Sequence, residues 1–510
     1  MGKRAFVPLL LGLAALLTVI PLFFLPFSSG RIFMSPDETA NVFAAKMFRQ
    51  TLSMRTDMPI LADLPWLHPR SFVSQGTGLV PVGFLGLPMV LGALSVIFGD
   101  LIFLLFTPLL VASVVYPLSR MTESWKIPSR LLTIGAWLTF PTVILYANRG
   151  LFPNLNVVCL TIWAMYLLWR RRSAWRCIGS GILLGLALAI RPIEAFWILP
   201  WVWLAWRERK DPQHRNVERT WLVLMSLGVF IVAIVYLLVA YRTYGDPFAV
   251  GYWLRDPVLS SGVPSVTEAS RWPFGFHPMH VWFNVKNYFG SYLWTWMTIA
   301  ITSVAVAWRQ RPLRRTLFVG LWTVVSLVLV YGQAVYQDHV GLNVTSTGNS
   351  FLRYLVPIAP LIALAAGCVA EWALRRMKQV TAHTLVASIG VLLLVLGMWT
   401  AVARDDEGLL ATATELHGYA SLRSSMDATI PKEAIILSDR SDKIFFPDYR
   451  SASPLPSFFE IKRLLSVTDV PVYLYARTLD AQTSARLDAE GIRAAPVLAG
   501  PRESLYLLSS

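Results

Sequence analysis

"IGSGILLGLALAIRPIEAFWILPWVWLAW", residues 178–206, is the stretch whose interpretation decides the fold. It is apolar except for Arg191 and Glu194 near its middle, and basic clusters lie on both sides, at 170–176 and 207–215. One long helix would put these clusters on opposite sides of a membrane, whereas two short helices turning at Arg191 would return the chain to the side it left. We expect the hairpin, because it keeps the later basic clusters on one side. A single long span remains the alternative.

The composition indicates a membrane protein. Of the 510 residues 55% are hydrophobic and 15% are charged, whereas a soluble protein carries about 25% charged residues. Apolar runs of roughly 18 residues or more recur up to about residue 402, and such runs cross a bilayer as helices because the backbone must satisfy its own hydrogen bonds there. The first run, Phe6 to about Phe27, lacks a small-residue cleavage site, so we expect an uncleaved span.

The positive charge is distributed as in a polytopic membrane protein. Up to residue 403 there are 33 Lys and Arg against 15 Asp and Glu, and from residue 404 onward there are 12 against 15. The excess lies in short clusters between apolar runs, which is the positive-inside pattern, so we expect no nucleic-acid partner. With these clusters in the cytoplasm, about 11 transmembrane helices follow, with the N-terminus inside and a long first outer loop at 28–99. After the first, the expected spans lie near 100–118, 131–147, 151–168, 178–190, 193–206, 220–242, 288–308, 316–336, 352–373 and 383–402.

From residue 404 the apolar runs shorten to strand length. We expect strands at 434–438, 470–476 and 504–510, and a helix that ends at Gly491. The predicted fold is therefore an all-α polytopic membrane domain, residues 1–403, followed by a small extracytoplasmic α/β soluble domain, residues 404–510. An apolar piece at 79–98 is expected to lie along or dip into the outer face. The charged and aromatic segment 437–450 is expected to be a binding loop or a solvated turn.

Two adjacent acids stand at the start of the first outer loop, in "FMSPDETANVF", residues 33–43. Ser35-Pro36-Asp37-Glu38 has the spacing of a capping box, with Ser35 as N-cap and Glu38 three residues later. Acids in a first turn also complement the helix dipole, so stability alone explains the motif. A second, compatible interpretation is that capping immobilises Asp37 at the membrane surface, where the helix N-terminus keeps it ionised as a general base must be.

Three blocks together resemble a known family. They are the Asp-Glu pair just after the first span, "GILLGLALAIRPIEAFWILP" (181–200), and "FLRYLVPIAPLIALAAG" (351–367). In order and spacing they resemble the GT-C-fold membrane glycosyltransferases, such as the protein O-mannosyltransferases and the bacterial aminoarabinose transferases. The resemblance implies a polyprenyl-phosphate-sugar donor and inverting transfer to an acceptor hydroxyl outside the cytoplasm. Asp37 then matches the acid that deprotonates this hydroxyl, with Glu38 and Glu194 as supporting acids.

A lipid-carried donor has a phosphate leaving group, and bidentate arginine suits phosphate. Arg191 and Arg353 are the best candidates to bind it, followed by Arg149, Arg70 and His68. Each arginine has a simpler explanation, because long basic side chains also reach from a helix end to the membrane surface. Arg191 and Glu194 could equally form a structural ion pair.

The sequence departs from the family in one place. Relatives carry a further acid after the third span, where "NRGLFPNLNVV" (148–158) offers Asn154 and Asn156. No His/Asp cluster with ligand spacing replaces it, so we expect no catalytic metal and no other cofactor. Two other classes stay open. A secondary transporter would show two paired halves, and this sequence has no such symmetry. A non-catalytic membrane assembly protein would use its soluble domain as the working part.

Overall fold

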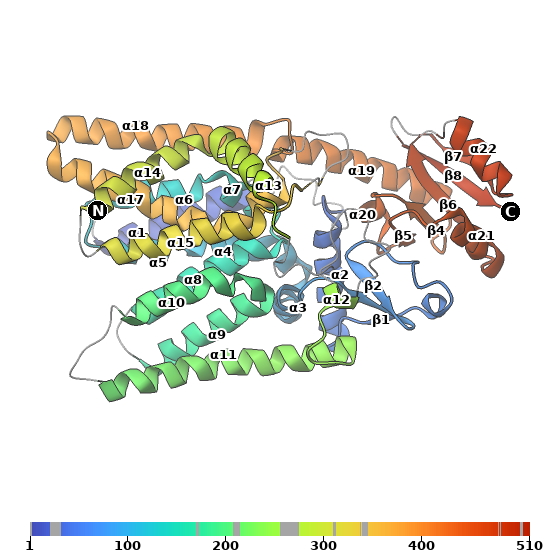
Figure 1. The fold of residues 1–510 in the computed structure, drawn as a ribbon, viewed down its shortest axis with the longest axis horizontal. Coiled ribbons are helices and arrows are strands. Elements are labelled where there is room, and N and C mark those ends of the chain that lie inside the picture. The colour runs from blue at the N-terminus through green and yellow to red at the C-terminus, as the bar shows by residue number, and fades with distance from the viewer. Residues whose placement is uncertain are drawn as a thin grey trace. The chain divides into compact units, whose positions relative to one another are not determined.

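The structure is a computed structural model that describes residues 3–20, 32–169, 173–207, 215–254, 275–309, 313–336, 338, 345–477, 479, 481–499 and 503–510 (Figure 1). The chain divides into two compact units. Unit 1 is Met1–Leu25, Asp100–Tyr236 and Val266–Thr412, and unit 2 is Pro26–Gly99, Leu237–Ser265 and Ala413–Ser510. The first loop, 28–99, thus falls in the same unit as the C-terminal residues. The expected boundary at residue 403 stays a prediction.

Unit 1 is helical. Its α-helices, two of which extend beyond it, are α1 (Lys3–Val19), α4 (Ile102–Ser113), α5 (Val115–Met121), α6 (Ile127–Leu138), α7 (Pro141–Asn148), α8 (Pro153–Trp169), α9 (Ala174–Ile190), α10 (Ala195–Arg207), α11 (Arg215–Tyr244), α13 (Pro278–Asn284), α14 (Trp294–Trp308), α15 (Arg314–Tyr331), α16 (Ser350–Tyr354), α17 (Ala359–Arg376), α18 (Gln379–Met398) and α19 (Leu409–Thr429). Short 3-10 or π turns at Pro192–Glu194, Val285–Tyr292, Val356–Ile358 and Trp399–Ala403 join several of them.

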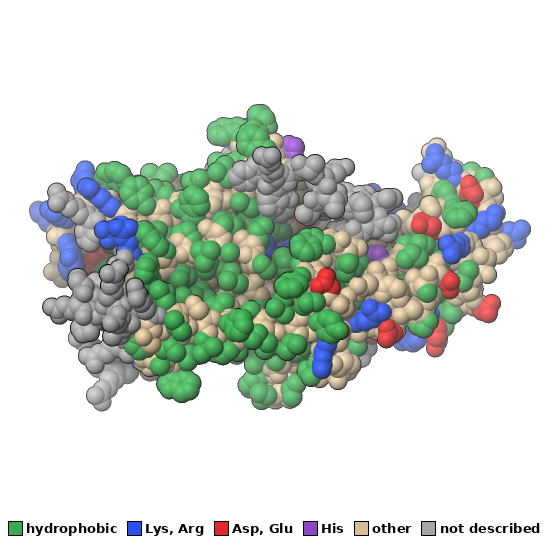
Figure 2. All heavy atoms as spheres, turned by 60° about the horizontal axis from the view of Figure 1, so that its bottom comes forward, with side chains coloured by type: hydrophobic (Ala, Val, Ile, Leu, Met, Phe, Trp, Pro, Cys, Tyr) green, Lys and Arg blue, Asp and Glu red, His purple; other side chains and the backbone are tan. Residues whose placement is uncertain are grey.

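These helices identify an integral membrane protein. Among the described residues five helices are long and apolar enough to cross a membrane, or up to eight if each bent pair counts as one span. Their outer faces are apolar: Phe230 on α11, Ile301 on α14 and Val391 on α18 are each 60–67% exposed, and Figure 2 shows hydrophobic side chains spread over the helices. Exposed apolar surface on this scale fits contact with lipid. The count of about 11 spans stays a prediction, and the basic residues at 170–172, 208–214 and 310–312 lie outside the described residues.

The chain turns sharply at the expected place. Helix α9 and the helix that follows Arg191 are bent by 120° relative to each other, so residues 178–206 do not form one straight helix, and two crossings of the membrane by this stretch stay a prediction. The expected span at 131–147 is likewise broken, because α6 ends at Leu138 and Pro141 begins α7 at an angle of 52°. Proline cannot donate the hydrogen bond that would continue the first helix through this point.

Small residues let α9 and α11 approach closely. A Cβ at Gly181 would lie 2.0 Å from the Met225 carbonyl oxygen, and one at Gly228 would lie 2.3 Å from the Ile178 carbonyl oxygen. Helices in membranes associate through such close backbone packing. The contact fixes α9, whose C-terminal end carries Arg191.

Unit 2 contains two small sheets. Its strands are β1 (Thr56–Asp57), β2 (Phe72–Gln75), β3 (Gly78–Pro81), β4 (Ile435–Ser438), β5 (Arg450–Ala452), β6 (Val472–Arg477), β7 (Arg493–Leu498) and β8 (Glu503–Ser509). The first three form an antiparallel sheet in the order β1-β3-β2. The others form a five-stranded sheet in the order β5-β4-β6-β8-β7, in which β4 pairs in parallel with β5 and β6, while β8 runs antiparallel to β6 and β7.

The helices of unit 2 are α2 (Pro36–Thr51), the 3-10 turn Pro59–Ala62, α3 (Gly86–Phe98), α12 (Gly251–Leu254), α20 (Asp442–Phe445), α21 (Phe458–Val467) and α22 (Ala481–Ala489). The three predicted C-terminal strands and the helix before Gly491 are confirmed, and Gly491 has the positive φ of 75° that ends such a helix. The apolar piece at 79–98 forms β3 and α3. Strands β5 and β7 and the small sheet of the first loop were not predicted, because their runs are too short to show a period.

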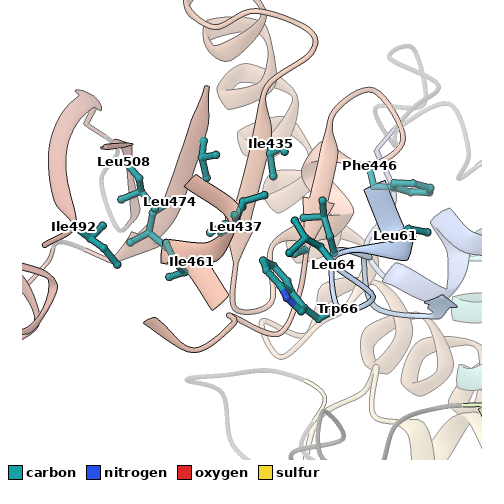
Figure 3. Close-up of a cluster of buried hydrophobic side chains, with 14 of the residues drawn as sticks. Leu61, Leu64, Trp66, Ile435, Leu437, Phe446, Ile461, Leu474, Ile492 and Leu508 are labelled. Atoms are coloured by element: carbon teal, nitrogen blue, oxygen red, sulfur yellow. The ribbon is translucent and has the colours of Figure 1, made fainter. Parts of the chain in front are cut away.

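One hydrophobic core joins the first loop to the C-terminal sheet (Figure 3). Leu61, Leu64 and Trp66 from the loop are buried in the same cluster as Ile435 and Leu474 from the sheet. Apolar burial is the main stabilising term in folding, so these two parts of unit 2 stabilise each other. The loop that carries Asp37 is therefore a folded element.

A charge network ties α19 to the segment after α20. Arg423 contacts Asp427 at 2.9 Å and Asp448 at 2.8 Å, and Lys432 contacts Asp427 at 2.6 Å. The Tyr449 hydroxyl donates to Asp427 at 2.8 Å. Burial alone would raise the pKa of the Asp427 carboxyl, but hydrogen bonds from Lys432, Arg423 and Tyr449 outweigh it and hold this pKa well below its usual range. Burial, with the hydrogen bond to Asp427, raises the pKa of Tyr449 to about 12.

Candidate active site

Asp37 lies in the first turn of α2, as expected. Ser35 is the N-cap residue, with φ −127° and ψ 145°, and Pro36 begins the helix. The Ser35 hydroxyl accepts a hydrogen bond from the backbone N–H of Asp37 at 3.3 Å, which satisfies one of the free donors of a helix start. The Asp37 side chain is exposed, whereas Glu38 is buried. The two acids therefore occupy different environments, and only Asp37 is open to a substrate.

A second contact fixes the Asp37 carboxylate. The Ser71 hydroxyl donates a hydrogen bond of 2.6 Å to its Oδ1. Ser71 has a left-handed backbone, with φ +64°, which costs a residue other than glycine roughly 1 kcal/mol or more. A strained backbone of this kind persists only where the surrounding structure fixes the position of the residue. Asp37 is thus restrained through both its backbone and its side chain.

Arg70, immediately before Ser71, is bound to the buried carboxylate of Asp442. Its backbone N–H donates to Oδ2 and its Nε donates to Oδ1, each at 2.8 Å. Its guanidinium also donates to the carbonyl of Arg440. The nearby His68 has its Nδ1 3.1 Å from the Pro69 carbonyl oxygen. Roles for Arg70 and His68 in phosphate binding stay predictions.

Arg191 and Glu194 form an ion pair in unit 1, at the turn after α9. Arg191 Nε donates to Glu194 Oε1 at 2.9 Å, and the two side chains are 12% and 3% exposed. The Tyr331 hydroxyl donates to the same oxygen at 2.8 Å and accepts from Arg191 at 3.1 Å. The Trp197 indole donates to the other carboxylate oxygen. Glu194 is thus a structural partner that orients Arg191.

The structure brings three of the predicted arginines together around two aromatic rings. Arg191 and Arg353 lie over the Tyr354 ring, with guanidinium carbons 5.0 and 5.4 Å from its centroid. Arg353 and Arg149 lie over the Phe152 ring, at 4.2 and 5.1 Å. These three guanidinium groups, which we call the arginine cluster, are arranged by cation–π contacts. Guanidinium groups present several N–H donors, and this chemistry suits an anionic ligand.

Asn154 and Asn156, which stand where a second acid was expected, contact other parts of the protein or are buried. Asn156 accepts from the Thr107 hydroxyl at 2.9 Å and donates to the Phe152 carbonyl at 3.2 Å, and Asn154 is buried. In the described part of the chain no group of three or more His, Cys, Asp or Glu side chains has a geometry suited to a metal ion. Residues 148–158 themselves contain no Asp or Glu.

Several residues that organise these sites were not predicted. Ser71 and Asp442 stand 34 and about 400 residues from Asp37, so no local spacing links them to it. Tyr331 and Phe152 sit in apolar runs where aromatic residues are common. The one available signal was Tyr354, which follows Arg353 in the "RY" block that carries the resemblance. The 437–450 segment is not a solvated turn, because Asp442, Lys443 and Phe445 within it are buried.

Comparison with known proteins identifies the fold. The chain is similar to ArnT from Cupriavidus metallidurans in its apo state, with a TM-score of 0.56 and 11% identity over 99% of this chain and 98% of that one. It also overlays on the arabinofuranosyltransferase AftD from Mycobacteria, with a TM-score of 0.49 and 14% identity, covering 40% of that longer chain. No family model and no curated protein matches the sequence. The likeness to ArnT confirms the resemblance in fold to the GT-C membrane glycosyltransferases.

Proposed function

We propose that this protein is an inverting glycosyltransferase, of the hexosyl or pentosyl class. It moves a sugar from a polyprenyl-phosphate carrier to an acceptor hydroxyl on the extracytoplasmic face of the membrane. The fold shared with ArnT over nearly the whole of both chains supports the class of enzyme. The basic loops support the orientation, since positive clusters favour the cytoplasmic side. Nucleotide sugars are cytoplasmic, so transfer outside requires a lipid-carried donor.

The observation that carries the proposal is the arginine cluster. A phosphate ester that leaves as a dianion needs cationic partners with a fixed geometry, and guanidinium groups bind phosphate oxygens through two parallel N–H donors. In unit 1, Arg191 is oriented by Glu194 and Tyr331, and Arg353 donates to the Ser350 hydroxyl at 2.8 Å. Preorganised donors of this kind stabilise charge that develops in a transition state. Arg191 and Arg353 are our proposed phosphate ligands, and Arg149 assists them.

Asp37 is the proposed general base. In the transfer step the acceptor oxygen bonds to C1 of the sugar while the bond from C1 to the phosphate oxygen breaks. The hydroxyl proton passes to the Asp37 carboxylate, and the bonding electrons leave with the polyprenyl phosphate. Attack from the side opposite the leaving group inverts the configuration at C1. The exposed carboxylate, restrained by Ser35 and Ser71, suits this role because a general base must be held in hydrogen-bonding reach of its proton.

The test is sugar transfer by purified protein in lipid vesicles. Wild type and Asp37→Asn would be incubated with radiolabelled polyprenyl-phosphate pentoses and hexoses and a cell-envelope extract as acceptor. Asp57→Asn is the matched control, since Asp57 lies in the same loop, is 73% exposed and pairs only weakly with Arg55 at 3.2 Å. We expect labelled product from wild type and control and a loss of about 100-fold or more in Asp37→Asn. Full activity in Asp37→Asn would refute the base, and consumption of no donor by wild type would refute the enzyme class.

A further inference from the structure

Two consecutive residues of the C-terminal sequence contact the chain on both sides of Asp37. Asp442 and Lys443 open the short helix α20, and both are buried. Asp442 binds Arg70, which precedes the serine that donates to Asp37. Lys443 binds the carbonyl of Met34, which precedes the N-cap of the helix that carries Asp37. All of these residues belong to unit 2.

The contact with Arg70 determines where Ser71 stands. The two oxygens of Asp442 accept from the backbone N–H and from the Nε of Arg70, each at 2.8 Å. One carboxylate thus holds both the main chain and the side chain of a single residue. The next residue, Ser71, keeps its left-handed backbone, and its carbonyl accepts from Val82 N–H at 2.9 Å. The hydroxyl is thereby directed at Asp37.

The contact with Met34 fixes the other end. Lys443 Nζ donates to the Met34 carbonyl at 2.9 Å in a buried setting, and the Met34 side chain packs with Leu416 of α19. Beneath the same region, the ring of Phe43 on α2 meets that of Phe446, just after α20, with centroids 4.8 Å apart. The start of α2 is therefore held against the C-terminal residues by both polar and aromatic contacts.

We propose that the C-terminal residues of unit 2 position the general base, and that Asp442 and Lys443 are the positioning residues through which they do so. This rests on the proposed function of Asp37. The shared hydrophobic core already holds the first loop and the C-terminal sheet together (Figure 3). Burying an aspartate and a lysine is costly, and apolar residues would hold the two parts together as well or better. What the pair adds is a fixed orientation of two backbone points that flank Asp37, as a catalytic group requires.

The experiment compares Asp442→Asn and Lys443→Met with Ser457→Ala in the full-length protein in vesicles. Ser457 caps α21 in the same unit and contacts Glu460, so its loss lowers stability at a cap that is far in sequence from Asp37. Two readouts are taken: kcat and KM for sugar transfer, and hydrogen exchange of the amides at 34–40 and 70–73. We expect the two test variants to lose about 10–100-fold in kcat, with KM for the donor little changed, and to exchange faster at both segments. The control should match wild type in both readouts.

A double variant shows whether Asp442 acts through Ser71. If it does, Asp442→Asn added to Ser71→Ala lowers kcat by much less than it does in the wild-type background. Equal effects in both backgrounds, or the same loss of kcat in Ser457→Ala, would overturn the proposal. Exchange also decides the matter if wild type transfers no sugar. Faster exchange confined to the two test variants would then support positioning while the proposed function fails, and unchanged exchange would overturn the positioning itself.

Discussion

Replacing Glu194 by glutamine tests how unit 1 holds Arg191. Glu194 Oε1 accepts from both Arg191 Nε and the Tyr331 hydroxyl, and its other oxygen accepts from the Trp197 indole. A glutamine has one accepting oxygen, so its amide N–H would face a donor at one of these positions. The substitution also removes the negative partner of a guanidinium that is 12% exposed. At this low exposure water compensates the guanidinium only in part.

The expected cost follows from that burial. Removing one partner of a buried ion pair lowers the free energy of unfolding by about 3–5 kcal/mol. The matched control is Glu371→Gln, because Glu371 pairs with Arg375 at 2.7 Å but that arginine is 62% exposed and can be solvated. Loss of an ion pair with an exposed partner should lower the free energy of unfolding by about 1 kcal/mol or less. Glu371→Gln can also weaken the hydrogen bonds that Glu371 accepts from Lys126 and Ser129, and this cost comes in addition.

The assay is thermal unfolding in detergent micelles with and without polyprenyl phosphate. Glu194→Gln should unfold at a lower temperature than Glu371→Gln. Ligand that binds the folded state stabilises it, and a bound phosphate would supply the negative charge that the variant lacks. The rise in unfolding temperature on adding ligand should therefore be larger in Glu194→Gln than in wild type. Equal stability of the two variants would refute the structural role of Glu194, and a ligand effect absent from both wild type and variant would refute phosphate binding at Arg191.

Three further outcomes are expected. Gly181→Ala places a Cβ 2.0 Å from the Met225 carbonyl oxygen, so it should lower the stability of unit 1 by about 1–3 kcal/mol. Gly135→Ala is the control, because a Cβ there would meet no atom within 4 Å. Equal unfolding temperatures of the two variants would contradict this prediction. The folded protein holds the pKa of Asp427 below its usual value, so Asp427 contributes stability that is present above about pH 4 and is lost as the pH falls further. The stability of Asp427→Asn, measured by fluorescence, should therefore depend less on pH in that range than the stability of wild type. An unchanged pH dependence would count against the charge network. Arg353→Gln should lower kcat/KM for the lipid-linked donor by about 10–100-fold in a donor titration, and an unaltered value would exclude Arg353 as a phosphate ligand.

What the sequence predicted correctly was local or periodic. The helix start at Ser35 was predicted from adjacent residues, and the C-terminal strands from short apolar runs of β-forming residues. The turn at Arg191 was predicted from the pattern of basic clusters along the chain. In each case the signal is a pattern that can be seen in the sequence without knowledge of distant side-chain contacts.

What the sequence did not reveal depends on distant contacts. Asp442 lies 372 residues after Arg70, and its carboxylate is held by that arginine's backbone and side chain. From the sequence it was one acid in a charged segment, with nothing to distinguish burial from exposure. The meeting of Arg149 and Arg353 over Phe152 likewise depends on how helices pack, which hydrophobic periodicity does not specify.

The most direct test of the central claim is the single-turnover rate of sugar transfer in Asp37→Asn, at saturating donor and acceptor. Asparagine keeps the shape of the side chain and can still accept from the Ser71 hydroxyl, so the change removes the base and little else. Our account predicts a rate about 100–10,000-fold below wild type, with Asp57→Asn at the wild-type rate. A single-turnover rate in Asp37→Asn equal to that of wild type would contradict it.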